Sequence, residues 1–246
     1  MKTYLPLLLL FTFSFIYSQN KSGIATYKLQ IAFDKDALEV DKKYGYLQKA
    51  IDICNDLEYK LVFNKNEANF FQEENQKLDI VATNMANILS ETPKISYQNI
   101  EQNILLSELK ADGILIQQKE FLIKEDLKIN WTITSESKLI DNYLCYKALT
   151  TKIVYKGDKG FNENVIAWFC PTIPFSFGPT KYSGLPGLIL ELQEKNIAFT
   201  LKSLTLNDND IVKIIIATAK KTISQTEYND IVKTRMETLQ SMSKQK

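Results

Sequence analysis

The stretch from Asp141 to Phe175, DNYLCYKALTTKIVYKGDKGFNENVIAWFCPTIPF, decides the fold. Residues 143–156 are typical of one long strand, with successive side chains on opposite faces. Residues 156–164 are polar and contain two glycines, so they predict a turn. Residues 165–170 predict the returning strand, which Pro171 ends because proline cannot donate to a sheet ladder. The stretch therefore predicts an antiparallel hairpin.

Strand signals recur on both sides of this hairpin. Alternating polar and apolar residues mark segments 22–33, 57–64 and 127–134 as half-buried strands. An Asp112-Gly113 pair predicts a hairpin turn between two further strands. Those two strands are 104–111 and 114–121, and the remaining predicted strands are 67–76, 188–192, 196–206 and the isoleucine-rich 211–221.

Two segments predict helices that flank the sheet. Residues 34–57 form a helix or a long loop containing one, whereas residues 78–90 are ambiguous. Residues 224–244 predict a C-terminal helix that begins at a capping box of Ser224 and Glu227. No repeat, linker or shift in composition divides the chain. We therefore expect one mainly β domain with flanking helices (α+β), built on a large antiparallel sheet.

The first residues have the layout of a secretory signal peptide. Lys2 gives a positive start, residues 4–17 carry no charge, and polar residues follow at once. The expected cut lies near 18/19, which leaves 1–18 as the signal peptide and 19–246 as the single domain. An uncleaved anchor is the alternative, although the apolar run is short for a membrane span. We expect an exported protein of the periplasm or cell envelope with no transmembrane span.

Composition argues against several classes of function. The chain has no histidine, which removes Ser-His-Asp and Cys-His catalysis and histidine-ligated metals. The 30 basic and 29 acidic residues nearly cancel, and Arg235 is the one arginine, so neither nucleic acid nor a phosphate clamp is expected. We therefore predict a protein that is not an enzyme, with no metal and no cofactor.

The three cysteines are Cys54, Cys145 and Cys170, and they form no Cys-x-x-Cys motif. Cys54 is expected on the apolar face of a helix. If the hairpin turns within its polar stretch, Cys170 falls near Leu149, two pairs from Cys145. A Cys145–Cys170 disulfide then needs another register or a bulge, because its Cα atoms must approach to about 7 Å. Buried thiols are the alternative.

The most apolar part of the mature chain is KYSGLPGLILEL, from Lys181 to Leu192. It predicts a tight bend entering a strand, because glycine allows close backbone approach and proline fixes φ. The bend residues are Gly184, Leu185, Pro186, Gly187 and Leu188, and the flanking rings are Trp168, Phe175, Phe177 and Tyr182. The bend is either a buried corner or the rim of a cavity, and the rings are either core or the lining of a groove.

Four ordered blocks, 121–134, 138–148, 167–179 and 181–192, carry a family resemblance. Together they are similar to the GLPGLI family of exported Bacteroidetes proteins, which takes its name from the hexapeptide Gly184–Ile189 found here. The family has no established activity, so the resemblance implies a fold and a location rather than a chemistry. Cys170 departs from the family pattern. The order of strands also loosely resembles periplasmic lipoprotein carriers, which implies an open half-barrel.

We expect a non-enzymatic envelope protein that binds an apolar small molecule or a partner protein. Its contact surface is predicted at Trp168 and the bend residues with their flanking rings. One alternative is an envelope hydrolase that uses carboxylates alone, drawn from Glu125, Asp126, Glu136, Asp141 and Glu191. Another is a structural or assembly partner of an outer-membrane complex, which would present a flat apolar patch or an unpaired sheet edge.

Overall fold

The computed structural model describes residues 21–31, 46–73, 89–90, 92–110, 115–117, 119–156, 159–208 and 212–244. Among these residues, twelve strands form one open sheet in the order β12-β6-β5-β4-β3-β2-β1-β11-β10-β9-β8-β7. Neighbouring strands are antiparallel, except that β12 pairs with β6 in parallel. The predicted mainly β fold with a C-terminal helix is confirmed.

The elements follow the chain in this order: β1 (Ser22–Ile31), α2 (Tyr46–Asp56), β2 (Glu58–Asn64), β3 (Glu67–Gln72), β4 (Ile95–Asn99), β5 (Ile104–Glu108), β6 (Phe121–Asp126), β7 (Thr132–Ile140), β8 (Tyr143–Lys156), β9 (Lys159–Cys170), β10 (Leu188–Glu194), β11 (Ile197–Asn207), β12 (Lys221–Ser224) and α4 (Gln225–Lys244).

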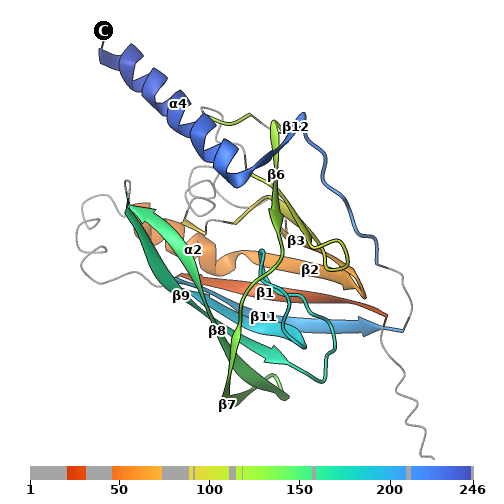
Figure 1. Cartoon of the computed structure of the whole chain (residues 1–246). Coiled ribbons are helices and arrows are strands. Elements are labelled where there is room, and N and C mark those ends of the chain that lie inside the picture. Colours follow the sequence, from red (N-terminus) through yellow and green to blue (C-terminus); the bar gives the residue numbers. More distant parts are fainter. Residues whose placement is uncertain are drawn as a thin grey trace, which may run out of the picture.

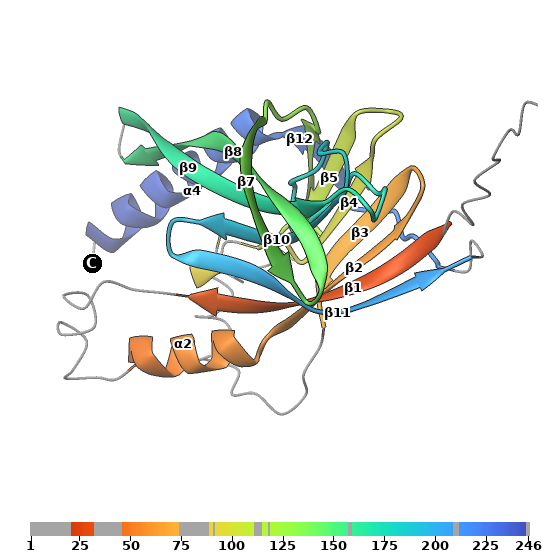
Figure 2. The ribbon, with the colours of Figure 1, turned by 90° about the horizontal axis from the view of Figure 1, so that it is seen from below.

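The sheet is strongly curled (Figures 1 and 2). Seen from below, β1 and β11 lie between an arm made of β7, β8 and β9 and an arm made of β2 to β5 (Figure 2). The helix α2 runs alongside β1 and contacts it. The curl gives the sheet an inner face, on which the main core is built.

Aromatic rings from four strands, β1, β2, β3 and β11, occupy the middle of this core. Tyr27 pairs with Tyr59 across β1 and β2, and Leu29 pairs with Phe199 across β1 and β11. The ring of Tyr59 stacks on Phe70 at 5.4 Å and meets Phe199 edge-on at 5.3 Å. Each of these side chains is buried, and burial of such a side chain contributes about 2–3 kcal/mol.

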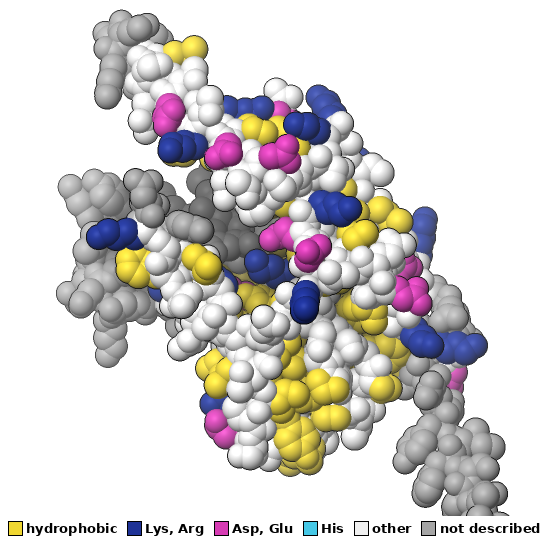
Figure 3. Space-filling model, in the orientation of Figure 1, with side chains coloured by type: hydrophobic (Ala, Val, Ile, Leu, Met, Phe, Trp, Pro, Cys, Tyr) yellow, Lys and Arg dark blue, Asp and Glu magenta, His cyan; other side chains and the backbone are white. Residues whose placement is uncertain are grey.

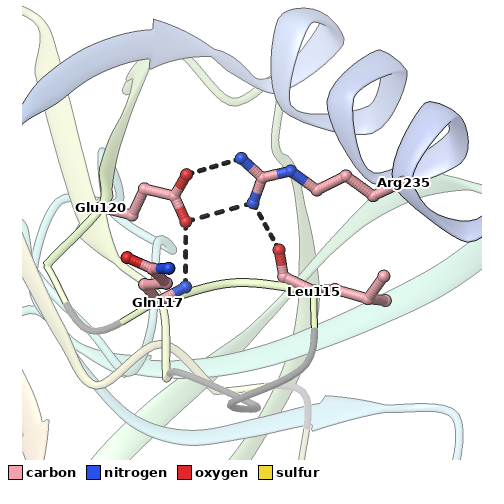
Figure 4. Close-up of polar contacts among 4 residues, drawn as sticks. All are labelled: Leu115, Gln117, Glu120 and Arg235. Atoms are coloured by element: carbon pink, nitrogen blue, oxygen red, sulfur yellow. Dashed lines mark hydrogen bonds and ion pairs between the residues drawn. The ribbon is translucent and has the colours of Figure 1, made fainter. Parts of the chain in front are cut away.

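The C-terminal helix α4 begins at the predicted capping box and is held by an apolar cluster with Phe121 and by an ion pair. The Glu227 amide donates to Ser224 Oγ (3.1 Å), and the Ser224 amide donates to Glu227 Oε2 (2.8 Å). Arg235 forms a forked pair with the carboxylate of Glu120 and also donates to the Leu115 carbonyl (Figure 4). The hydrogen bonds from Arg235 lower the pKa of Glu120 from 4.5 to about 2.

Several local predictions are corrected. Residues 115–117 and 119–120 are not strand, and the partner of β5 is 121–126 instead. The predicted strand 127–134 is wrong over 127–131, which connect β6 to β7, and only 132–134 are strand, at the start of β7. The predicted strand 211–221 is wrong over 212–219, which is held by a side chain rather than by a ladder, as described below.

Other predictions fall partly on residues that the structure leaves out. Asp112-Gly113 lies outside the described residues, as do most of the ambiguous segment 78–90, residues 34–45 and the predicted signal peptide. In the described part of the chain, no helix is long and apolar enough to cross a membrane.

Candidate functional site

The hexapeptide is a buried corner between β9 and β10. Its backbone is tied to the preceding loop by bonds from the Gly184 amide to the Ser176 carbonyl (2.9 Å) and from the Leu188 amide to the Ile173 carbonyl (3.0 Å). Gly187 lies so close to β9 that a Cβ atom there would sit 2.2 Å from the Cys170 carbonyl oxygen. Gly184 has a φ of +87°, a conformation that favours glycine.

Most side chains of the predicted contact surface lie inside the core. Phe175, Phe177, Tyr182, Leu185 and Leu188 are buried, whereas Gly184 and Pro186 are exposed and Gly187 is buried. The Phe175 ring packs against Phe63 at 4.7 Å, and the Tyr182 ring lies 5.9 Å from Trp131. These contacts give the segment a packing role.

Trp168 is half-buried and belongs to a different group of side chains. The register pairs it with Lys147 on one side and Glu191 on the other. Lys138 Nζ lies 4.4 Å from the centroid of the Trp168 ring and 2.7 Å from Glu191 Oε2. The side chain of Trp168 is therefore engaged in a cation–π contact and an ion-paired cluster.

The observed register brings two cysteines together, contrary to the sequence-based expectation. Tyr146 pairs with Phe169 at the end of the β8–β9 ladder, so Cys145 and Cys170 are adjacent at the next position, and the predicted pairing of Cys170 near Leu149 is wrong. Both are buried free thiols. Burial, followed by the neighbouring Cys170, raises the pKa of Cys145 to about 12. Cys54, on α2, is also a buried free thiol.

The curled sheet encloses a central cleft made of two cavities of about 430 and 800 Å³. Glu125, Lys152, Ile153 and Lys181 line both cavities. Lys152 pairs with Glu194 at 2.5 Å and with Glu163 at 3.4 Å. Acidic and basic side chains lie side by side across the middle of the face in Figure 3. The central cleft therefore presents walls of mixed charge, with an ion pair at Lys152.

The five candidate carboxylates are dispersed. Glu125 and Asp126 line the central cleft, on adjacent positions of β6. Glu136 pairs with Lys147 on the surface, and Glu191 pairs with Lys138. Asp141 lies in the exposed turn between β7 and β8. Within the described residues, no group of three or more Cys, Asp or Glu side chains could hold a metal ion.

A second cavity, which we call the Lys110 pocket, lies on the outer side of β3, β4 and β5 and has a volume of about 620 Å³. Its wall is mainly apolar, with a few lysines and glutamates. The lining residues are Phe71, Gln72, Glu73, Lys94, Ile95, Glu108, Lys110, Lys119, Ile215, Ile216, Ala217 and Thr218. The volume lies within the range of about 300–1,000 Å³ typical of small-molecule sites.

Residues 212–219, the strap, form one wall of this pocket, and Asn69 holds them there. Asn69 is buried on β3, and its amide nitrogen donates to the Ile215 carbonyl (2.8 Å). Its amide oxygen accepts from the Ile215 amide (2.6 Å). One side chain thus supplies both backbone bonds that a neighbouring strand would otherwise supply. Ile215 and Ile216 remain 51% and 57% exposed beside the pocket.

Lys110 lies half-buried in the wall of the pocket, just after β5. Its ammonium donates to Gln72 Oε1 (2.9 Å) and to Thr92 Oγ1 (3.1 Å). Thr92 in turn contacts Tyr59 OH (3.3 Å) and Ser90 Oγ (3.0 Å). Burial lowers the pKa of Lys110 from 10.5 to about 8, because a desolvated ammonium is disfavoured.

Sequence reasoning did not single out Asn69 or Lys110. A detectable signal existed for Asn69, since an amide between apolar residues of a buried strand requires partners. Lys110 has no such signal, because lysines that follow a strand are usually solvated. Its burial depends on Gln72 and Thr92, which lie 38 and 18 positions away in the chain.

Comparisons with known proteins bear on the predicted family resemblance and on the fold. A family described as "Protein of unknown function (Porph_ging)" matches residues 158–191 and corresponds to the GLPGLI family of Bacteroidetes, so the predicted resemblance is confirmed over these residues. No curated protein sequence matches the chain.

Two solved structures of PNGF-II, in space groups P21 and C2, are similar to the chain with a TM-score of 0.50 and 13% sequence identity. The similarity covers 87% of this chain but only 34% and 33% of those chains, so this chain spans about a third of their length. At this identity the similarity concerns the fold alone.

Proposed function

We propose that this protein is an exported, non-enzymatic binding protein of the periplasm or cell envelope that holds an apolar small molecule in the Lys110 pocket. The observation that carries the proposal is the strap. It keeps two isoleucines about half-exposed at the wall of a cavity that is already lined by Phe71 and Ile95. A ligand lying against these side chains would bury apolar surface at about 25 cal/mol per Å².

The central cleft supports this function less well. Its walls carry ion pairs, above all Lys152 with Glu194 and Glu163, which an apolar ligand would have to desolvate. It also favours the hydrolase alternative only weakly. Glu125 and Asp126 lie side by side on one strand, rather than on opposite sides of a bound substrate.

A second candidate, docking of a partner protein, is favoured by the free edge of β7. The strand β7 ends the sheet, and Leu139 and Leu144 form a cross-strand pair that is 69% and 46% exposed. Figure 3 shows hydrophobic side chains gathered at the lower end of the molecule, where β7 and β8 meet in Figure 1. However, β7 is bulged between Ile133 and Ser137, and bulges hinder edge-to-edge pairing.

Native mass spectrometry of the protein purified from its own cell envelope, and after incubation with 1-decanol, tests the proposal. We expect a bound apolar molecule in the wild type and a loss of binding of about tenfold or more in Ile216→Glu. Leu139→Glu is the matched control, because it places a charge at a similarly exposed position away from the pocket. A wild-type protein that takes up no apolar molecule would overturn the proposal.

A further inference from the structure

We propose that Cys145 and Cys170 form a disulfide bond in the mature protein, and that this bond is made during folding and is then shielded from solvent by the core. Such a bond needs the exported location proposed above, because disulfides form and persist outside the reducing cytosol. It is independent of the Lys110 pocket and of any ligand held there.

The register of β8 and β9 places the two cysteines opposite each other. Tyr146 pairs with Phe169, so Cys145 and Cys170 meet at the next position of this antiparallel pair. Directly opposed residues of an antiparallel pair have Cα atoms about 4.5–5.5 Å apart and side chains close together on one face. A disulfide spans Cα separations of about 4.4–6.8 Å, so the strands can accept one without a change of register.

The sulfur atoms already lie together. The Cys145 and Cys170 side chains are hydrogen-bonded to each other. Cys145 Sγ also donates to the Tyr143 carbonyl (3.5 Å), and Cys170 Sγ lies 3.1 Å from Thr172 Oγ1. Thiols are weak donors and acceptors, so the loss of these contacts on oxidation costs little.

The third thiol is held in a different place. Cys54 lies on α2, where Lys110 and Tyr59 are its charged and titratable neighbours. The structure therefore assigns Cys145 and Cys170 as the pair and leaves Cys54 outside it.

The surrounding strands hold both partners in position. Leu188 of the hexapeptide corner pairs with Cys170, and the Ile173 amide donates to the Cys170 carbonyl (3.2 Å). On the other side, Lys138 of β7 pairs with Cys145. The bond would therefore link the buried corner covalently to the strands β7 and β8 at the end of the sheet.

Burial determines when the bond can form. Both cysteines are fully buried, and burial, followed by the neighbouring Cys170, raises the pKa of Cys145 to about 12. Thiol–disulfide exchange requires a thiolate and access to an external disulfide. The unfolded chain meets both conditions, since an exposed cysteine has a pKa of about 8.5, whereas the folded protein meets neither.

The reaction is a two-electron oxidation by an external disulfide, such as oxidised glutathione or the disulfide of a thiol oxidoreductase. The thiolate of one cysteine attacks the external disulfide, forms a mixed disulfide and releases one thiol. The thiolate of the other cysteine then attacks the protein sulfur of the mixed disulfide and releases the second thiol. The two cysteine protons end on the two released thiols.

Thiol trapping tests the bond in the native protein. Cells are lysed into urea with N-ethylmaleimide, and the purified mature protein is digested without reduction for peptide mass spectrometry. We expect the Cys145 and Cys170 peptides to be joined and Cys54 to be alkylated. Alkylation of both Cys145 and Cys170, or a bond that includes Cys54, would overturn the proposal. If this pair joins in glutathione in vitro but is alkylated in cells, the exported location fails and the geometry stands.

Two measurements on the purified protein test the order of events and the strength of the link. Oxidised glutathione should join the pair at least about tenfold faster in refolding protein than in folded, reduced protein, and equal rates would refute the shielding. In urea, the oxidised wild type should have an unfolding constant about 100-fold smaller than protein refolded and kept in dithiothreitol. Cys145→Ala is the matched control, and the reductant should not change its unfolding. Equal stability of the oxidised and reduced wild type would contradict the proposed link.

Discussion

Replacing Lys110 with methionine should make the protein more stable at neutral pH. Burial lowers the pKa of Lys110 from 10.5 to about 8, so the charged amine is held in the folded state at a cost of roughly 3 kcal/mol. Methionine has a similar length and avoids this cost, but it loses the hydrogen bonds of the Lys110 ammonium, among them those to Gln72 and Thr92, worth about 1 kcal/mol each. The expected net gain in the free energy of unfolding is about 1 kcal/mol at pH 7.

The pH dependence distinguishes this explanation from simple repacking. Lys110 loses its proton near pH 8 in the folded state and near pH 10.5 in the unfolded state. Between these values the unfolded state binds more protons, so the stability of the wild type relative to the variant rises with pH. The cost of Lys110 is thus complete below about pH 8 and relieved by about pH 10.5. Among the described residues, the charged or titratable groups around it include Cys54, Glu73, Lys94, Glu108 and Lys119.

Urea unfolding at pH 7, 8.5 and 10 measures the effect. The stability advantage of Lys110→Met should shrink steadily over this range and reverse at its upper end. There the Lys110 amine is largely uncharged, so the wild type keeps its hydrogen bonds without the cost of burying a charge. Lys119→Met, at an exposed position beside the same pocket, should change stability by less than about 0.5 kcal/mol. A variant that is less stable than the wild type at pH 7, or a difference independent of pH, would refute the reasoning.

Four further predictions concern the scaffold. Gly187→Ala should lower the free energy of unfolding by about 3 kcal/mol, because its Cβ would meet a backbone carbonyl at 2.2 Å. Gly184→Ala, which meets no atom within 4 Å but keeps a φ of +87°, should cost about 1 kcal/mol in the same denaturant titration. Refolding with oxidised glutathione should join Cys145 to Cys170 while the oxidant leaves as two glutathione thiols. Peptide mapping would identify the bridge, and recovery of both Cys145 and Cys170 as thiols after refolding would exclude it. Glu120→Gln should speed hydrogen exchange along α4. In the wild type, the stabilisation that the ionised Glu120 gives through Arg235 is present above about pH 4.5 and is lost as the pH falls towards 2.

The parts of the fold that were predictable are those whose signal is local. The capping box of α4 depends on residues three positions apart, and β1, β2 and β11 each carry their own strand pattern. For β9 the sequence predicts only 165–170, and the predicted turn is wrong over 159–164, because these polar residues pair with the end of β8. The strap shows where local signals fail. Its isoleucine-rich sequence is typical of a buried strand, but both backbone groups of Ile215 bind the Asn69 side chain, 146 positions away. The spacing of apolar residues within the strap gives no sign of this distant partner.

The family signature and the proposed site lie in different parts of the chain. The family match covers residues 158–191, which contain the end of the long hairpin and the hexapeptide corner. None of the residues that line the Lys110 pocket lies in this range, since they come from β3, β4 and β5 with their adjoining residues, from Lys119 before β6 and from the strap. Gly187 and the buried leucines of the corner explain why this segment needs its particular residues, and that requirement is one of packing. A match over the corner therefore carries no information about the Lys110 pocket, and the proposed ligand has to be judged from lining residues such as Phe71, Lys110 and Ile216.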